Sequence, residues 1–570
     1  MNPKRDYLLP ICWFFLVLYP FQYIWQGLRV SDEGNAMTSY QQIFSHPESI
    51  ADTFGSWGTS VIGGLWLAAF EDLGLVGIRV GGILMSFLTV LFVYLLYRNH
   101  IERKKLLWSL FGSFIFCFHF ANYIGIHYYG TSILFYCISI FLLAEGLKKR
   151  NGPLLFLAGF LITFNVFVRL PNLMGFLLVL AIPFYSHLKC SDYKKSARQL
   201  LWFAGGSVLS LFAVCCVMMQ LGHLQHYADA IRYLFISATS SDAASNHGNL
   251  TGKVLRDFFD ISRTSLLVAA LLSVCVAIWQ VTMRHHKRLA IAIPWIFFAI
   301  FALSGLTGRP LMGSAITFLI GMCFLVLGLR SIKPNSDKDL SLISFLIFVL
   351  LGIIPLGSGG GYHSYMMYPL LIALPLVLHY IQEISAIKTE ATLRICDYTK
   401  KIAFIFDEQD FCKIKNFLFL FLIVFGFANN ISYIDGELEN RSQLTSSINH
   451  PLLRGIHTTK KKAEPLNQLI EQLPRYVHPG DPMLVAWISP IIYYISKAHP
   501  YIPHPWTEVY LANPMREFLL NGPSRGPLPV VIRENCKEKH RHDDILAEFY
   551  KKYGYTKKWG NEFYEIYTPF

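Results

Sequence analysis

The chain has 570 residues, of which 53% are hydrophobic and only 15% are charged, and its formal net charge is +13. Soluble globular chains carry about 25% charged residues, so this deficit, together with repeated apolar runs of span length, excludes an ordinary soluble protein. The positive charge does not indicate a nucleic-acid partner, because Lys and Arg lie mostly in short loops between apolar runs, where they set membrane orientation.

The apolar runs predict about thirteen membrane spans. The first run is not expected to be a removable signal peptide, because no small-residue cleavage site follows it. The segment "SVIGGLWLAAF" (60–70) fits either the start of the second span or an interfacial helix. The predicted spans are 8–28, 75–97, 106–124, 130–147, 153–170, 172–187, 199–221, 261–281, 289–306, 313–330, 339–356, 365–381 and 415–434.

The loops between these spans alternate in charge. One side collects basic segments such as "RNHIERKK", "RHHKR" and the stretch 382–414, whereas the other collects "SDEGN", "GIHYYG", "RLPN", "GLTGRP" and "GSGGGYHS". Loops rich in Lys and Arg stay in the cytoplasm, so the N-terminus is predicted to be cytoplasmic and the residues after 434 to lie outside. The fold class is therefore a multi-pass α-helical membrane protein with an outer C-terminal region.

The predicted boundary divides a polytopic module, 1–434, from a small extracytoplasmic α/β domain, 435–570. "PMLVAWI" and "PLPVVIRE" have the pattern of buried strands, "SPIIYYISKA" and "DDILAEFYKKYG" that of helices, and "KKWGNEFYEIY" that of a hairpin around Gly-Asn. The eleven cysteines include no CxxC pair, and the domain has no HExxH. We therefore expect neither a disulfide framework nor a thiolate zinc site.

Candidate site residues gather on the predicted outer face. Asp32 and Glu33 open the first outer loop (29–74), where they fit solvated loop charge, the cap of a helix predicted from Asn35 to Phe44, or catalysis. An ionisable group at a membrane boundary is costly unless it faces water, a partner or a ligand. An arginine there also has an ordinary use, as a lipid contact or a helix C-cap. The other candidates are Arg169, Arg309, His363 and Tyr365 near span ends, and His226 and His247 in the long outer loop 222–260.

This pattern resembles the GT-C superfamily of integral-membrane glycosyltransferases, the group of the protein O-mannosyltransferases and the aminoarabinose lipid A transferase. In that superfamily an acidic residue sits just after the first span, the position of Asp32, and interfacial helices follow. The stretch from "HYYGTSILFYC" to "FVRLPNL" is similar to middle spans of bacterial members. "GDPMLVAWISPIIYYISKAHPYIPHPW" looks like the opening of their outer domain. Many members carry an Asp-Glu pair, which "SDEG" matches loosely.

The resemblance implies an inverting transfer of a sugar from a polyprenyl-phosphate donor to a saccharide, lipid or protein acceptor. Asp32 would be the base, and Glu33 would orient the acceptor, bind a metal or act as an alternative base. Arg169 and Arg309 would meet the leaving phosphate, His363 and Tyr365 would donate hydrogen bonds, and His226 and His247 would contact substrate. Whether a divalent cation takes part stays open. With the short loops, the resemblance favours a bacterial inner membrane.

Three other interpretations remain open from the sequence. A transporter or flippase for a lipid-linked saccharide would suit the many spans, although we find no internal repeat of broken helices. A polysaccharide polymerase or ligase would be expected to carry a dominant mid-chain loop rich in Arg and His. A non-catalytic scaffold would keep the fold without the chemistry.

Overall fold

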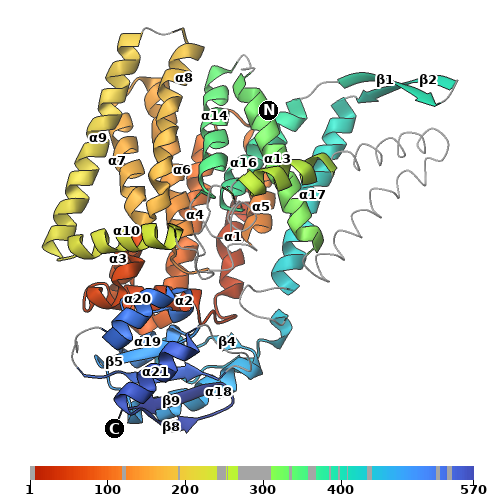
Figure 1. Cartoon of the computed structure of the whole chain (residues 1–570). Helices are drawn as coiled ribbons and strands as arrows, with labels where there is room; N and C mark the ends of the chain where they lie inside the picture. Colours follow the sequence, from red (N-terminus) through yellow and green to blue (C-terminus); the bar gives the residue numbers. More distant parts are fainter. Residues whose placement is uncertain are drawn as a thin grey trace.

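The computed structural model describes residues 7–118, 124–190, 193–239, 252, 255–267, 310–332, 337–356, 367–383, 387–395, 398–406, 408–432, 440–521, 527–535 and 542–569. These residues form a helical bundle with a mixed α/β region at one end (Figure 1). We call the end of the bundle that faces this region the domain-facing end, and the opposite end the far end.

The chain enters the bundle through α1 (Leu8–Leu18), which tightens into the 3₁₀ helix η1 (Tyr19–Tyr23). Pro20 lies at the start of η1, and because it has no N–H to donate to the carbonyl four residues earlier, the α-helical hydrogen-bond pattern of α1 ends there. Three helices then lie between the bundle and the C-terminal region (Figure 1). They are α2 (Asp32–Gln42), the 3₁₀ helix η2 (Pro47–Ser56) and α3 (Trp57–Ala69).

The predicted ambiguity at residues 60–70 is resolved by a sharp break between α3 and α4. Phe70 leaves the helical conformation, the short 3₁₀ helix η3 (Glu71–Leu73) follows, and Gly74 has a φ of +52°. A Cβ at Gly74 would lie 2.2 Å from the carbonyl oxygen of Leu452, so both the backbone angle and the space require glycine. The segment 57–69 is therefore a separate helix and not the start of the second span.

The bundle helices coincide with most of the predicted spans. Four helical segments among the described residues are long and apolar enough to cross a membrane: Glu71–Tyr97, Tyr128–Lys149, Leu170–Leu188 and Lys194–Gln220. The protein is an integral membrane protein, and its total number of spans stays a prediction, because the predicted span 289–306 lies outside the described residues. The helices are α4 (Gly74–Tyr97), α5 (Arg103–Phe118), α6 (Tyr128–Lys149), α7 (Gly152–Val168), the 3₁₀ helix η4 (Leu170–Leu180), α8 (Ala181–Leu188), α9 (Tyr193–Gln220), α13 (Pro310–Ile332), α14 (Lys338–Ile353), α16 (Met367–Glu383) and α17 (Glu408–Ser432).

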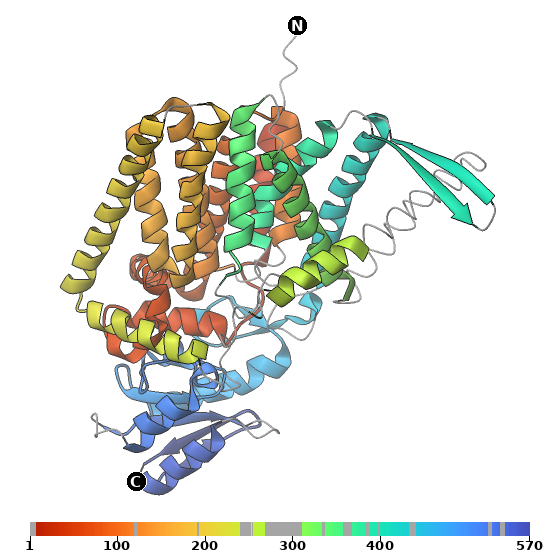
Figure 2. The same ribbon diagram turned by 45° about the horizontal axis from the view of Figure 1, so that its top comes forward.

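One helix and two strands fall in segments for which the sequence predicted only loops. Helix α10 (Leu224–Thr239) occupies the first part of the predicted outer loop 222–260 and packs on η2. Strands β1 (Ile387–Ile395) and β2 (Tyr398–Phe406) pair antiparallel within the predicted basic loop 382–414. This hairpin projects from the far end of the bundle (Figures 1 and 2).

The C-terminal region contains the predicted strands and helices in the predicted order. Its five-stranded sheet has the order β6-β5-β7-β9-β8, in which β6, β5 and β7 are parallel and β9 and β8 add antiparallel. The elements are the 3₁₀ helix η5 (Arg441–Gln443), β3 (Ser446–Ser447), the 3₁₀ helix η6 (Pro451–Leu453), β4 (His457–Thr458), α18 (Lys460–Gln472), the 3₁₀ helix η7 (Leu473–Arg475), β5 (Pro482–Ala486), α19 (Ile491–Ser496), β6 (His499–Pro500), the 3₁₀ helix η8 (Thr507–Val509), α20 (Ala512–Arg516), a π-helical turn (Glu517–Asn521), β7 (Val530–Glu534), α21 (Asp543–Tyr553), β8 (Thr556–Gly560) and β9 (Tyr564–Thr568).

The C-terminal region docks tightly on the first outer loop. The backbone N–H of Ile491 donates to the carbonyl of Val30 at 3.2 Å, and the hydroxyl of Thr38 donates to the carbonyl of Pro490 at 2.9 Å. A Cβ at Gly34 would lie 2.3 Å from the nitrogen of Ile491, so α2 and α19 meet backbone to backbone. The residues around Asp32 are therefore held between the bundle and the sheet.

Candidate functional site

The two adjacent carboxylates that open α2 have different surroundings. Asp32 and Glu33 both lie in the first helical turn, where the helix dipole favours negative charge. The Asp32 side chain is 44% exposed and accepts a hydrogen bond from Arg29 Nη2 at 2.7 Å. The Glu33 side chain is only 2% exposed. Asp32 is therefore the carboxylate of the pair that solvent or a substrate can reach.

Glu33 forms a buried ion pair with Arg79 of α4. Arg79 Nε donates to Glu33 Oε1 at 2.9 Å and Nη2 donates to Oε2 at 2.8 Å. The same guanidinium also donates to the carbonyls of Ile24 at 2.8 Å and Gly27 at 2.7 Å. Both oxygens of Glu33 are thus engaged, and the pair ties the end of the first helix, the start of α2 and α4 together.

Sequence reasoning missed Arg79, although a signal was present. This arginine interrupts the predicted second span, "GIRVGGILMSFLTVLFVYLLY", and is almost completely buried. An ionisable side chain within a span is expensive and requires a partner or a function. The sequence could therefore have predicted that Arg79 forms an ion pair with one of the two carboxylates, Asp32 or Glu33, that follow the first span.

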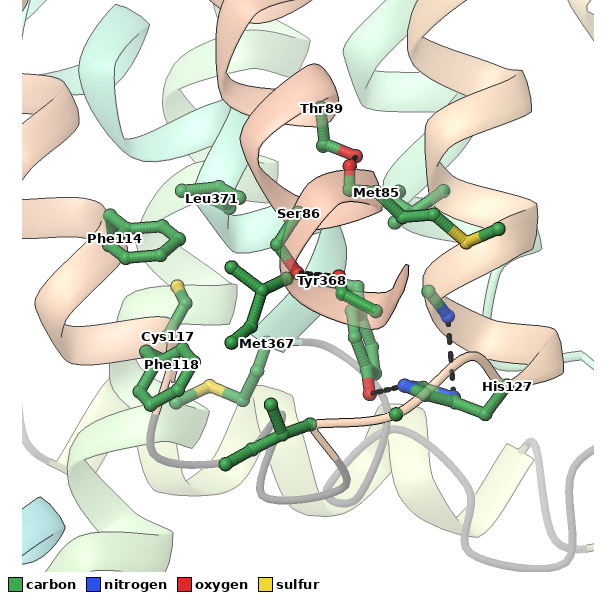
Figure 3. A pocket seen from close by; sticks show the side chains of 16 residues that line it. Met85, Ser86, Thr89, Phe114, Cys117, Phe118, His127, Met367, Tyr368 and Leu371 are labelled. Carbon is green, nitrogen blue, oxygen red and sulfur yellow. Dashed lines mark hydrogen bonds between the residues drawn. The ribbon is translucent and has the colours of Figure 1, made fainter. Parts of the chain in front are cut away.

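A second cluster surrounds His127 at the start of α6. The backbone N–H of Gly130 donates to His127 Nδ1 at 3.4 Å, and Nε2 lies 3.1 Å from the hydroxyl oxygen of Tyr368 on α16 (Figure 3). Burial and, to a smaller extent, the positive charge of Arg29 together lower the pKa of His127 to about 3. The imidazole is therefore neutral at physiological pH, and because Nδ1 accepts, the proton lies on Nε2 and is donated to Tyr368.

The electrostatic effect of Arg29 on His127 links the two clusters. Arg29 carries the ion pair with Asp32 and lies within electrostatic reach of the imidazole. His127 also borders a cavity of about 40 Å³ at the domain-facing end, between α4, α5, α6 and α16. Such a cavity has room for ordered water or a small polar group. Its lining residues include Gly82, Ser86, Thr89, Cys117, His127 and Tyr368 (Figure 3).

Arg169 lies at the end of α7, buried against the end of α14. It donates from Nη1 to the carbonyl of Ile354 at 3.2 Å and from Nη2 to that of Leu356 at 3.5 Å. Its guanidinium also stacks on the ring of Tyr129, 4.7 Å from the centroid, and that ring stacks on Tyr368 at 5.9 Å. Arg169 therefore caps a helix C-terminus, one of the two uses that the sequence left open, and its contact with a donor phosphate stays a prediction.

The remaining predicted residues divide into two groups. His226 lies on α10, where its ring makes an edge contact with Phe54 of η2 at 6.0 Å. Arg309, His247, His363 and Tyr365 lie outside the described residues. Within the part of the chain that the structure describes, no group of three or more His, Cys, Asp or Glu side chains could hold a metal ion. A divalent cation stays a prediction.

Comparison with known proteins relates this architecture to membrane glycosyltransferases. The chain is similar to ArnT from Cupriavidus metallidurans bound to undecaprenyl phosphate, with a TM-score of 0.50, 9% identity, and 99% of this chain and 98% of ArnT covered. It is similar to the Archaeoglobus fulgidus oligosaccharyltransferase solved with Zn and sulfate, with a TM-score of 0.50, 12% identity, and 98% and 72% covered.

A third similar structure is the oligosaccharyltransferase AglB from Archaeoglobus fulgidus in complex with an inhibitory peptide and a dolichol-phosphate, with a TM-score of 0.48, 10% identity, and 100% and 75% covered. No family model matches the sequence, and no curated protein matches it. The fold is thus similar, over nearly the whole chain, to that of the GT-C lipid-donor glycosyltransferases, as the sequence resemblance predicted.

Proposed function

We propose that this protein is an inverting glycosyltransferase that takes its sugar from a polyprenyl-phosphate donor. The observation that carries the proposal is the position of Asp32. It is an accessible carboxylate at the domain-facing end of the bundle, on a fold shared over nearly the whole chain with ArnT, which was solved with undecaprenyl phosphate. The acceptor is an extracytoplasmic glycan, lipid or protein.

In the proposed reaction, Asp32 is the general base. The acceptor hydroxyl attacks the anomeric carbon on the face opposite the phosphate, and Asp32 takes the hydroxyl proton. The bond between the anomeric carbon and the phosphate oxygen breaks, and the lipid phosphate leaves with the electron pair. A positioned base of this kind contributes about 10²- to 10⁴-fold to rate.

The neighbouring residues have supporting roles in this proposal. Arg29 holds the Asp32 carboxylate in place through their 2.7 Å contact. Glu33 and Arg79 act as positioning residues, since their buried pair fixes the first turn of α2. Arg29 and Arg309 would meet charge on the leaving phosphate, and Arg169 would contribute from its place beside Tyr129. The protein would work in a bacterial inner membrane, in cell-envelope polysaccharide synthesis, with its C-terminal region in the periplasm.

Replacement of Asp32 tests the proposal. Asp32→Asn should lower the rate of sugar transfer at least about 100-fold, because it removes the base and keeps the shape of the side chain. The measurement is transfer of labelled sugar from lipid-linked donors, extracted from the source membranes, to acceptor in proteoliposomes. Asp72→Asn is the matched control, since Asp72 is an exposed acid in the same outer loop.

The outcomes separate the competing functions. Normal transfer by Asp32→Asn, with loss of transfer in a Glu33→Gln variant that melts at the wild-type temperature, would exchange the roles of the two carboxylates. If the wild-type protein transfers no sugar but moves lipid-linked saccharide across the proteoliposome membrane, the transporter hypothesis replaces this one.

A further inference from the structure

A second cavity lies at the far end of the bundle, away from Asp32 and His127. It has a volume of about 410 Å³ and is bounded by the segment before α5, the first two turns of α5, the end of α16 and the first half of α17. These ends lie on the side of the bundle opposite the C-terminal region (Figure 1). The lining residues are Ile101, Glu102, Lys104, Lys105, Trp108, Ser109, Leu378, His379, Gln382, Lys415, Asn416 and Phe419.

One part of this cavity is strongly basic. Lys104 and Lys105 come from the first turn of α5, and Lys415 comes from α17, whereas Glu102 is the acidic side chain among the lining residues. Lys105 pairs with Glu102 at 2.9 Å. The hydrogen bond from Lys105 lowers the pKa of Glu102, and the charges of Lys105, Lys104 and Lys415 lower it further. Three ammonium groups from two helices therefore act on one small region.

The lysines can accept another ligand without losing their present partners. Lys415 Nζ donates to Gln382 Oε1 at 3.0 Å, which joins α17 to α16. An ammonium group has three N–H donors, so Lys415 can hold Gln382 and an anionic oxygen together. The first-turn backbone N–H groups of α5 add partial positive charge at the same place.

Another part of the cavity wall is apolar and aromatic. The ring of Trp108 makes an edge contact with Phe419 at 5.8 Å, and Ile101 and Leu378 complete this wall. Tryptophan is enriched where a membrane meets water, and basic pockets between helices on the cytoplasmic side suit anionic lipid head groups. Adjacent basic and apolar walls match the phosphate and the glycerol–acyl portion of a phospholipid.

We propose that this cavity binds the phosphate of an anionic phospholipid in the leaflet at the far end, which the basic loops make cytoplasmic. The lipid connects α17 to α5 and α16. This site is separate from the proposed donor site, because it lies at the opposite end of the bundle, so its failure and the failure of the proposed glycosyltransferase activity are distinguishable.

Lipid retention by the full-length protein tests this proposal. The protein is placed in nanodiscs of phosphatidylcholine with a minority of phosphatidylglycerol, released into detergent, and examined by native mass spectrometry. The wild-type protein should retain phosphatidylglycerol selectively. The Lys104→Gln/Lys415→Gln variant should retain about 25-fold less phosphatidylglycerol, because each of the two basic residues near an anionic lipid contributes a factor of about five.

The matched control removes two exposed lysines from the same side of the membrane, at the start of α9. Lys194→Gln/Lys195→Gln should retain phosphatidylglycerol as the wild-type protein does. If both double variants lose phosphatidylglycerol equally, general positive charge attracts the lipid. If the Lys104→Gln/Lys415→Gln variant retains as much phosphatidylglycerol as the wild-type protein, the cavity does not hold the lipid. Either result overturns the proposal. The last measurement adds inorganic phosphate in place of lipid. If inorganic phosphate raises the melting temperature of the wild-type protein but not of the Lys104→Gln/Lys415→Gln variant, and the wild-type protein retains no phosphatidylglycerol, the cavity is a site for free phosphate and the lipid assignment is wrong.

Discussion

At the residue scale, Asp32 and Glu33 show how neighbours in one helical turn receive different roles. Successive residues on an α-helix point about 100° apart, so one side chain can face the interior while the next faces solvent. Glu33 faces Arg79 and is buried with both oxygens engaged, whereas Asp32 stays accessible beside Arg29. The buried pair supplies rigidity, and the accessible carboxylate is the one that we propose as the base.

The Glu33–Arg79 pair should be more important for stability than for chemistry. Glu33→Gln leaves the Arg79 guanidinium buried without its counter-charge, and breaking such a pair costs about 3–5 kcal/mol. Thermal unfolding in detergent should therefore show a clearly lower melting temperature for Glu33→Gln. Asp32→Asn, at a partly exposed site, should melt close to the wild-type protein. Wild-type stability in Glu33→Gln, combined with loss of transfer, would instead show that Glu33 touches substrate.

At the element scale, the junction of η2, α10 and the C-terminal region is built around an acidic group. Asp52 of η2 donates its backbone N–H to the carbonyl of Pro503 at 3.0 Å. The rings of Tyr233 on α10 and Tyr510 stack at 5.3 Å. Burial raises the pKa of the Asp52 carboxyl, a hydrogen bond with Tyr510 opposes the rise and the charge of Asp229 adds to it, so that the pKa lies at about 6. The junction therefore favours a protonated Asp52.

This pKa shift predicts a pH-dependent stability. A carboxyl whose pKa is higher in the folded state contributes stability that is fully present below about pH 4 and is lost as the pH rises through about 6. Asp52→Asn stays neutral, so it should be more stable than the wild-type protein at pH 7, by at most about 3 kcal/mol. The difference should shrink as the pH falls toward 4.5.

Melting temperatures between pH 4.5 and 7.5 measure this difference. Asp229→Asn is the comparison variant. It removes a charge that raises the pKa of Asp52, so the loss of stability with rising pH should lie at a lower pH but should still occur. Parallel curves for Asp52→Asn and the wild-type protein would show that Asp52 does not titrate at this junction.

At the scale of the whole molecule, the basic loops and the C-terminal region lie at opposite ends of the bundle. Cys190 lies in the basic connection between α8 and α9 and is exposed. Lys461, in the first turn of α18, is exposed on the C-terminal region. The positive-inside rule then predicts that the two residues lie on opposite sides of the membrane.

Cysteine labelling checks this orientation. In intact cells, a membrane-impermeant maleimide should label Lys461→Cys in a Cys190→Ser background. The labelling of Cys190 is the difference in signal between the wild-type protein and Cys190→Ser. This signal should be present only after the cells are permeabilised. Labelling of Cys190 in intact cells would invert the topology and would move the proposed site to the cytoplasmic face.

The sequence by itself determined the features that local pattern encodes. Apolar runs of span length located most bundle helices, since a helix that crosses a bilayer must satisfy its own backbone and present apolar side chains to lipid. Period-two and helical spacing located β5, β7, α21 and the β8–β9 hairpin in the C-terminal region. The resemblance that rested on Asp32 and the quoted stretches predicted the fold that the structural comparisons show.

Only the tertiary structure decided which of these residues meet. His127 and Tyr368 are 241 positions apart, and Glu33 and Arg79 are 46 apart, so no local pattern records either contact. Arg169 meets the end of α14 for the same reason, and β1 pairs with β2 inside a segment whose charge predicted only a loop. Local sequence sets which elements form, because their backbone and burial requirements are local. The surroundings of each charge depend on how distant elements pack, and that packing separated the accessible Asp32 from the buried Glu33.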